Sequence, residues 1–175
     1  MTQYARPDAD TSVGNWSASS GSNRYAMVDE ASTDDSDYIT VTDSYSGGEA
    51  ITLSLSSVTD PASGSGHSVV VRFSEDSSMD AVTLNVNLKD GGSSIKNEDF
   101  SGSSTANHTM TLSTAQANNI SESGYGNLAL VLTATDGGGI GSTSKIYQAY
   151  FACPDASSST PIAAIAMNTY RQMRG

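Results

Sequence analysis

Hydrophobic and polar residues alternate with a period of two through the middle of the chain. In residues 51–56, Ile and Leu alternate with Thr and Ser, and in residues 82–88 Val and Leu alternate with Thr and Asn. Because successive side chains of a β-strand point to opposite faces, each run is typical of a half-buried strand. We predict that both strands lie in the interior of a sheet, with Leu53, Leu84 and Val86 in the core.

Weaker alternation predicts six further strands between residues 24 and 154. They are 24–29, 38–42, 68–74, 108–112, 127–135 and 145–152. Turn sequences such as Asp60-Pro, Asp90-Gly-Gly and Asp136-Gly-Gly-Gly separate them. Eight short strands at this spacing predict an all-β fold, an antiparallel β-sandwich or jelly-roll-like single domain over residues 24–154. One helical turn is expected where Ser113 or Thr114 can act as the N-cap.

The two ends of the chain differ from the middle. Residues 1–23 are mostly small and polar, with Trp16 as an aromatic anchor, and we expect an extended N-terminal arm rather than a core strand. Residues 155–175 are expected to form a linker and a C-terminal docking tail, in which Pro161 can begin a helix. The stripe that would face a partner is Ile162, Ile165, Ala166 and Thr169, followed by Arg171 and Arg174. A disordered basic tail is the open alternative.

Composition and charge narrow the classes of partner. Ser and Thr fill 48 of the 175 positions, and 19 acidic against 8 basic residues give a net charge of −11. Such a surface repels phosphate backbones and anionic lipid headgroups, so we expect neither nucleic acid nor membrane as a partner. The chain shows no bilayer-spanning apolar run and no signal-peptide pattern at its start, so a soluble protein made in the cytosol is expected. Cys153, the one cysteine, lies in an apolar run and is expected to be buried.

The sequence offers no catalytic motif. His67 and His108 have no nucleophile elbow or comparable signature beside them, and His67, next to a Gly-Ser-Gly turn, is expected to be a solvated turn residue. The sequence contains no Cys/His cluster that would indicate a metal or cofactor site. The glycine-rich residues 136–141 lack the Lys and the following helix of a phosphate loop. We therefore expect a protein that is not an enzyme and has no catalytic, cofactor-binding or metal-binding residues.

Two ligand-binding alternatives remain open. The acidic segment could bind calcium through carboxylate oxygens, although it lacks the spacing of an EF-hand and a solvated acidic turn is the simpler interpretation. Its acidic residues are Asp29, Glu30, Asp34, Asp35 and Asp37.

Aromatic side chains could stack on sugars, and the candidates are Trp16, Tyr45 and Tyr125. Packing in the core explains aromatic residues more often.

A series of short motifs carries a family resemblance. The chain contains Arg6-Pro7-Asp8, then Trp16 in a Ser/Gly stretch, then Tyr25 followed by an acidic pair, and then residues 34–39, Asp-Asp-Ser-Asp-Tyr-Ile. This order resembles a group of phage and prophage-associated virion proteins, and looser similarity continues to residues 150–154, over about three quarters of the chain. The resemblance implies a β-sandwich on the head or tail of a phage, with no active site.

The function expected from the sequence is therefore that of a bacteriophage virion structural protein. A capsid decoration or head-associated protein, bound in many copies, is the first interpretation. Its partners would be other virion proteins, either the major capsid or a tail protein, and copies of itself, in a virion assembled in the bacterial cytoplasm. The alternatives are a tail, connector or baseplate component, or a carbohydrate-binding module for host adhesion.

Overall fold

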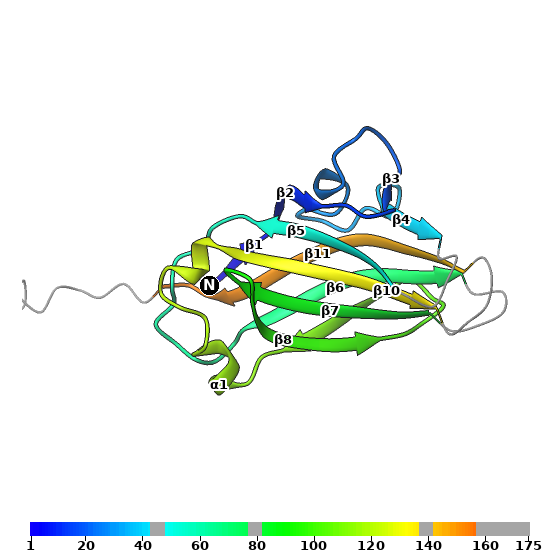
Figure 1. Cartoon of the computed structure of the whole chain (residues 1–175). Coiled ribbons are helices and arrows are strands. Elements are labelled where there is room, and N and C mark those ends of the chain that lie inside the picture. The colour runs from blue at the N-terminus through cyan, green and yellow to red at the C-terminus, as the bar shows by residue number, and fades with distance from the viewer. Residues whose placement is uncertain (43–47, 77–81, 137–141, 157–175) are drawn as a thin grey trace, which may run out of the picture.

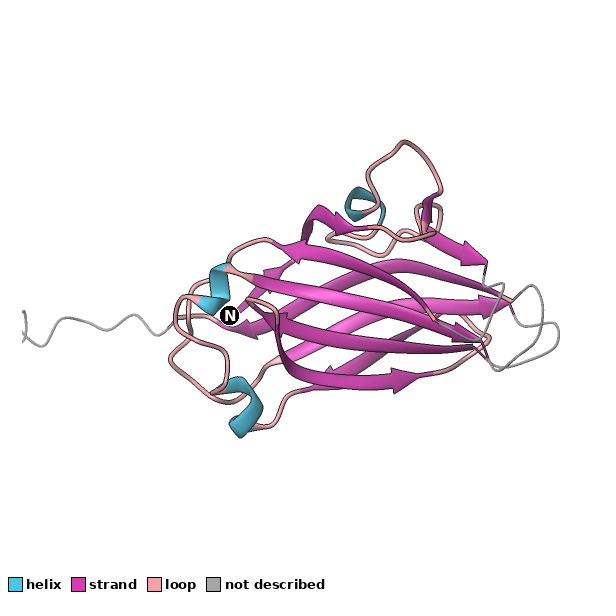
Figure 2. Cartoon of the chain, in the orientation of Figure 1, coloured by secondary structure: helices cyan, strands magenta, loops and turns pink. Residues whose placement is uncertain are grey.

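Two antiparallel β-sheets pack face to face around the hydrophobic core (Figures 1 and 2). The computed structural model describes residues 1–42, 48–76, 82–136 and 142–156. Sheet A contains, in order, β3 (Ser17–Ala18), β4 (Ile39–Thr42), β11 (Thr143–Pro154), β6 (Ser68–Asp76) and β9 (Ala106–Thr111), and β1 (Thr2–Ala5) also pairs with β11. Sheet B contains, in order, β2 (Pro7–Ser12), β5 (Glu49–Leu55), β10 (Leu128–Asp136), β7 (Val82–Asp90) and β8 (Ser93–Phe100).

The strands from β4 to β11 are connected as in a jelly roll. Neighbours in sheet A are β4, β11, β6 and β9, and neighbours in sheet B are β5, β10, β7 and β8. Successive strands therefore cross between the sheets, except at the β7–β8 hairpin. The two turn residues of that hairpin, Gly91 and Gly92, both have positive φ, which suits a tight hairpin turn. The antiparallel sandwich predicted from the sequence is confirmed.

Seven of the eight predicted strands are present, and the one at residues 24–29 is wrong. A 3₁₀ turn, η1 (Tyr25–Met27), occupies that segment. The carboxylate of Asp10 accepts the backbone N–H groups of Arg24 and Tyr25, at 2.9 and 2.7 Å. These bonds satisfy the first donors of the turn, so the segment needs no strand partner.

The short helix and the core strands agree with the pattern of the sequence. Ser113 caps α1 (Thr114–Ala117) through a capping box with Gln116. β5 and β7 flank β10 inside sheet B, and Leu53, Leu84 and Val86 are fully buried there. Within the described ranges, no helix has the length and apolar character that a bilayer crossing requires.

The N-terminal residues are extended, as expected, but they form strands of the sandwich. The expectation of an arm outside the core is therefore wrong for residues 2–18. β1 pairs with β11, β2 with β5, and β3 with β4. Ala5 and Trp16 are buried in the core, and the indole Nε1 of Trp16 donates to the carbonyl of Glu49 at 3.0 Å. These edge strands bury few side chains each, so their sequence is polar. The predicted docking tail lies outside the described residues from position 157 onward and stays a prediction.

Replacing Leu84 with alanine should lower the free energy of unfolding by about 2–5 kcal/mol, because the side chain is fully buried between the sheets. Urea unfolding measures this loss. The neighbouring variant Thr83→Ala, on the outer side of the same strand, should lose less than about 1 kcal/mol. Equal losses in the two variants would contradict the assignment of Leu84 to the core.

Candidate functional site

The aromatic residues proposed from the sequence for sugar binding do not form a platform. Trp16 is 1% exposed and Tyr125 is 4% exposed, so neither ring is available to a ligand. This part of the carbohydrate hypothesis is wrong, because both rings fill the interior of the fold. Tyr45 lies outside the described residues.

His67 is a buried residue, and its assignment as a solvated turn residue is wrong. Its Nδ1 lies 3.1 Å from the carbonyl oxygen of Ser65, and its Nε2 lies 2.8 Å from the hydroxyl of Tyr125. Because a carbonyl can only accept, Nδ1 carries the proton and Nε2 accepts from the Tyr125 hydroxyl. Burial lowers the pKa of His67 and raises the pKa of Tyr125 to about 12. The pair is therefore neutral and joins two loops at one end of the sandwich.

His108 and Cys153, the other titratable residues considered from the sequence, also pack against neighbouring side chains. His108 packs its ring against Phe73 and Phe100, at centroid distances of 4.5 and 5.2 Å, and burial lowers its pKa. Cys153 is buried, as expected from the sequence, and burial raises the pKa of its thiol to about 11.

The acidic segment does not gather its carboxylates around one point. Asp34 accepts from the backbone and hydroxyl of Ser36, whereas Asp35 binds the guanidinium of Arg72. No group of three or more His, Cys, Asp or Glu side chains that could hold a metal ion is found in the described part of the chain. The segment instead forms one wall of a cleft.

This cleft, which we call the tyrosine cleft, lies on the outer face of sheet A and has a volume of about 310 Å³. Its lining residues are Tyr4, Arg6, Ala31, Ser32, Thr33, Asn107, Gln148 and Tyr150. β1 and β11 are paired so that Tyr4 lies opposite Ala152, which places it diagonally across from Tyr150. The two rings meet edge to face at 5.5 Å. Tyr4 is 49% exposed, so much of its ring is open to a ligand.

Arg6 is held beside both tyrosine rings. The carbon of its guanidinium lies 5.4 Å from each ring centroid, in cation–π geometry. Its Nη1 donates to the carbonyl oxygen of Glu30 at 2.5 Å, and the side-chain amide of Gln148 donates to the same oxygen at 2.6 Å. One backbone carbonyl therefore fixes two donor side chains in the wall of the cleft. Burial raises the pKa of the Glu30 carboxyl to about 6, and the nearby Asp29 adds to this increase.

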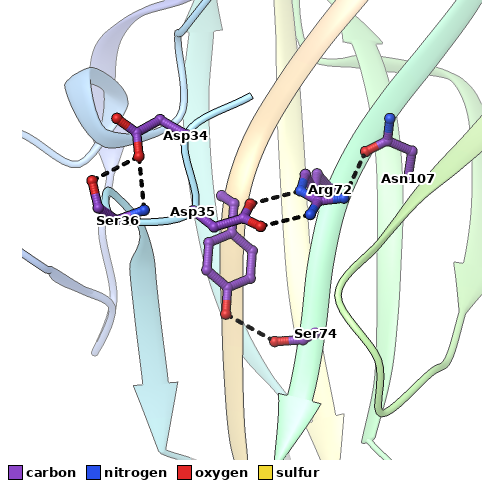
Figure 3. Close-up of polar contacts among 7 residues, drawn as sticks. Asp34, Asp35, Ser36, Arg72, Ser74 and Asn107 are labelled. Atoms are coloured by element: carbon purple, nitrogen blue, oxygen red, sulfur yellow. Dashed lines mark hydrogen bonds and ion pairs between the residues drawn. The ribbon is translucent and has the colours of Figure 1, made fainter. Parts of the chain in front are cut away.

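Polar side chains continue along the sheet from the tyrosine cleft. The β-bulge between Ile146 and Gln148 sets the register so that Gln148 lies opposite Arg72, which in turn lies opposite Asn107 on β9. Arg72 donates two hydrogen bonds to Asp35, at 2.7 and 2.6 Å, and its Nη1 lies 3.5 Å from the Asn107 side-chain oxygen (Figure 3). This row connects the cleft with the next part of the face.

A second tyrosine pair follows the Arg72 row. The rings of Tyr38 and Tyr147 are 5.8 Å apart, and the Nζ atom of Lys145 lies 4.8 Å from the Tyr38 ring centroid. The hydroxyl of Tyr147 bonds to Ser74 at 3.1 Å. Three of the six Lys and Arg residues in the described ranges, Arg6, Arg72 and Lys145, thus lie beside tyrosines or polar groups on the outer face of sheet A.

Sheet B carries a larger groove of a different kind. It has a volume of about 470 Å³ and no aromatic residue in its lining. Side chains of Thr, Ser, Asn, Lys and Asp surround a floor that includes Ala129 and Val131. It offers hydrogen-bonding groups and aliphatic side chains to a ligand, but no aromatic ring.

The sequence matches no protein-family model and no curated protein. Among solved structures, a carbohydrate-binding module specific for non-crystalline cellulose, CBM28, has a TM-score of 0.47 at 8% identity, over 84% of this chain and 96% of that one. The CBM36-1 domain of a multidomain xylanase from the hindgut metagenome of Trinervitermes trinervoides has a TM-score of 0.42 at 16% identity, over 90% and 99% of the two chains. The enzymatically active domain of bacteriophage CBA120 tailspike protein 4 has a TM-score of 0.41 at 9% identity, over 86% of this chain and 19% of that one. These likenesses are limited to the β-sandwich architecture.

The buried His67 should make stability depend on pH. Since its pKa in the folded protein is below the unfolded value, near 6.5, the unfolded chain binds the proton first as the pH falls. The contribution of His67 is therefore complete above about pH 6.5 and decreases below it. In urea unfolding, the stability difference between the wild type and His67→Gln should be largest at pH 8. It should shrink below pH 6.5 by at most about 1.4 kcal/mol per pH unit.

Tyr125→Phe is the matched control for this experiment. It removes the hydroxyl that bonds to His67 but leaves the imidazole buried, so this variant should keep the pH dependence of the wild type. Glu30, whose raised pKa gives the opposite dependence between about pH 4.5 and 6, is present in every variant and cancels in the differences. A His67→Gln difference that stays constant from pH 8 to pH 5 would show that His67 is not buried in its neutral form.

Proposed function

We propose that the protein is a glycan-binding β-sandwich module whose ligand lies in the tyrosine cleft. The observation that carries this proposal is the arrangement of Tyr4 and Tyr150 around Arg6, with Asn107 and Gln148 beside them. Aromatic rings and convergent polar groups in one concave site are typical of ligand-binding pockets.

A sugar ligand needs both an aromatic ring and polar groups in its binding site. A pyranose ring has an apolar C–H face, which packs on an aromatic ring, and hydroxyls that both donate and accept hydrogen bonds around its edge. Tyr4 supplies a half-exposed ring, while Asn107 supplies an amide that can donate and accept. Because the Glu30 carbonyl already holds Arg6 and Gln148, little side-chain entropy is lost there when a ligand binds.

Charge favours a neutral glycan over an acidic one. The acidic segment borders the cleft, and the whole chain carries a net charge of −11. The guanidinium of Arg6 is cationic, but it is surrounded by this negative field and is bonded to a backbone carbonyl. A carboxylated or sulfated sugar would experience repulsion from the surrounding residues, so the proposed ligand class is neutral oligosaccharide or polysaccharide.

The lining of the cleft supports binding rather than hydrolysis. Glycosidases position two carboxyl groups on either side of the scissile bond. The residues that line the tyrosine cleft include no Asp, Glu or His. We therefore propose a module that binds its glycan without cleaving it.

The expected place on a phage particle stays a prediction. A glycan-binding module is compatible with the host-adhesion alternative, in which such a protein attaches a particle to a cell-surface polysaccharide. In the described part of the chain, Met1 and Tyr4 are the large hydrophobic residues that are exposed, which gives little apolar surface for a permanent interface. Capsid decoration would then depend on the tail from Pro161 onward, which lies outside the described residues.

Truncating the tyrosines should abolish most of the binding. A glycan array of neutral plant and bacterial polysaccharides identifies the ligand, and isothermal titration calorimetry then measures affinity for the wild type and for Tyr4→Ala, Tyr150→Ala and Asn107→Ala. We expect each tyrosine variant to bind about tenfold or more weakly, because each loses an aromatic contact near the centre of the site.

Thr109→Ala is the control, because Thr109 is an exposed residue of β9 that does not line the cleft. Its affinity should equal that of the wild type, and circular dichroism should show that all four variants are folded. Unchanged affinity in both tyrosine variants would remove the tyrosine cleft as the binding site.

A further inference from the structure

We infer that the Asp35–Arg72 ion pair closes an extension of the tyrosine cleft, and that the ligand is an oligosaccharide chain which runs along β11 across both tyrosine pairs. This inference rests on the proposed glycan-binding function. It adds the length and direction of the ligand and a residue pair that controls access to half of the site.

The order of side chains along sheet A gives the direction. Tyr150 lies at one end, the Gln148–Arg72–Asn107 row follows, and Tyr147 with Ser74 comes next. Tyr150 lies three residues beyond Tyr147, and the β-bulge shortens this advance to between two and three regular residues, or roughly 7–10 Å at about 3.3 Å per residue. This separation is longer than one sugar ring, so a single ring cannot contact both pairs. A chain of several sugar units can.

Asn107 connects the two halves of the face. It lines the tyrosine cleft, and its side-chain oxygen also faces the guanidinium of Arg72. Arg72 is therefore next to the cleft, and its Nε and Nη2 donate to Asp35 (Figure 3). If Asp35 left, the guanidinium could donate to sugar hydroxyls at the boundary between the two halves.

The segment that carries Asp35 is lightly attached to the sheet. Residues 31–36 are all exposed, and Asp34 bonds within the segment, to Ser36. Asp35 reaches the sheet through Arg72, and Tyr38 follows with its ring against Tyr147. Tyr147 is 8% exposed in this arrangement and Tyr38 is half-buried, so the ring of Tyr147 is not available to a ligand while the segment lies in this position.

The ion pair is suited to opening. The side chain of Asp35 is 48% exposed, and an exposed pair of this kind stabilises a structure only weakly. The hydrogen bonds from Arg72 hold the pKa of Asp35 below its usual value, so the pair is fully ionised at neutral pH. Salt screens such a contact, and high ionic strength should therefore favour the open form.

Asp35→Asn tests the inference, with Asp34→Asn as the matched control. Both changes remove one negative charge from the same segment, but only the first weakens the contact with Arg72. Calorimetry compares the disaccharide and the hexasaccharide of the neutral glycan selected on the array. Asp35→Asn should bind the hexasaccharide up to about fivefold more tightly, because the ion pair no longer competes.

The disaccharide should bind all three proteins equally. The affinity of the wild type for the hexasaccharide should rise between low and high salt, whereas that of Asp35→Asn should not. Equal hexasaccharide affinities in Asp35→Asn and the wild type, at every salt concentration, would overturn the inference and leave the proposed function intact. An improvement of the same size in Asp34→Asn would also overturn it, because the effect would then be one of charge alone. Failure of the wild type to bind any glycan would instead contradict the proposed function, and this inference with it.

Discussion

Strand β11 is hydrogen-bonded along both edges, and the partners on its second edge come from three separate parts of the chain. β6 pairs with the first edge. On the other, β4 pairs with residues 143–146, β1 pairs with residues 151–154, and the carbonyl of Val28 accepts the N–H of Ala149 between them, at 2.9 Å. Because buried backbone donors and acceptors must be paired, this edge fixes where residues 1–5 and 28–42 lie. The tyrosine cleft is a consequence of that pairing.

The backbone pairing along this edge of β11 also brings the polar side chains on the outer face of sheet A together. β1 places Tyr4 and Arg6 beside Tyr150, and the segment after Val28 places the carbonyl of Glu30 between Arg6 and Gln148. These side chains are therefore held by backbone pairing in an extended sheet, which is a rigid support. The segment that carries Asp35 is attached to this face mainly by side chains, and this is where we propose that the site opens.

The strands could be predicted from the sequence where one face is apolar and the other polar. Alternation located β5 and β7, with Leu84 in the core, and Ser113 located the helix cap. β8 was not predicted from the sequence, because an edge strand buries few residues and shows little alternation. Asp90-Gly-Gly indicated the turn before β8 but not the pairing of β8 with β7. The buried state of His67 could not be read from its glycine-rich neighbours, since it depends on Tyr125, 58 residues away.

The candidate site could not be predicted from the sequence, because its residues also come from distant parts of the chain. Arg6 lies in an Arg-Pro-Asp sequence and Tyr150 in an apolar run, but no local pattern indicates that they meet. The aromatic residues that stand out among small polar neighbours, Trp16 and Tyr125, are buried instead. An outward position for Tyr150 could have been inferred from the alternation of β11, had the bulge before Gln148 been known.

We propose that the outer face of sheet A binds glycan. The most direct test of this proposal is a titration of ¹⁵N-labelled protein with the selected oligosaccharide, followed by NMR chemical-shift changes of the backbone amides. We expect the largest changes to cluster on β1, on residues 147–151 of β11 and around Asn107 of β9. Changes that cluster instead in the aromatic-free groove of sheet B, around Asn127 and Val131, would contradict it.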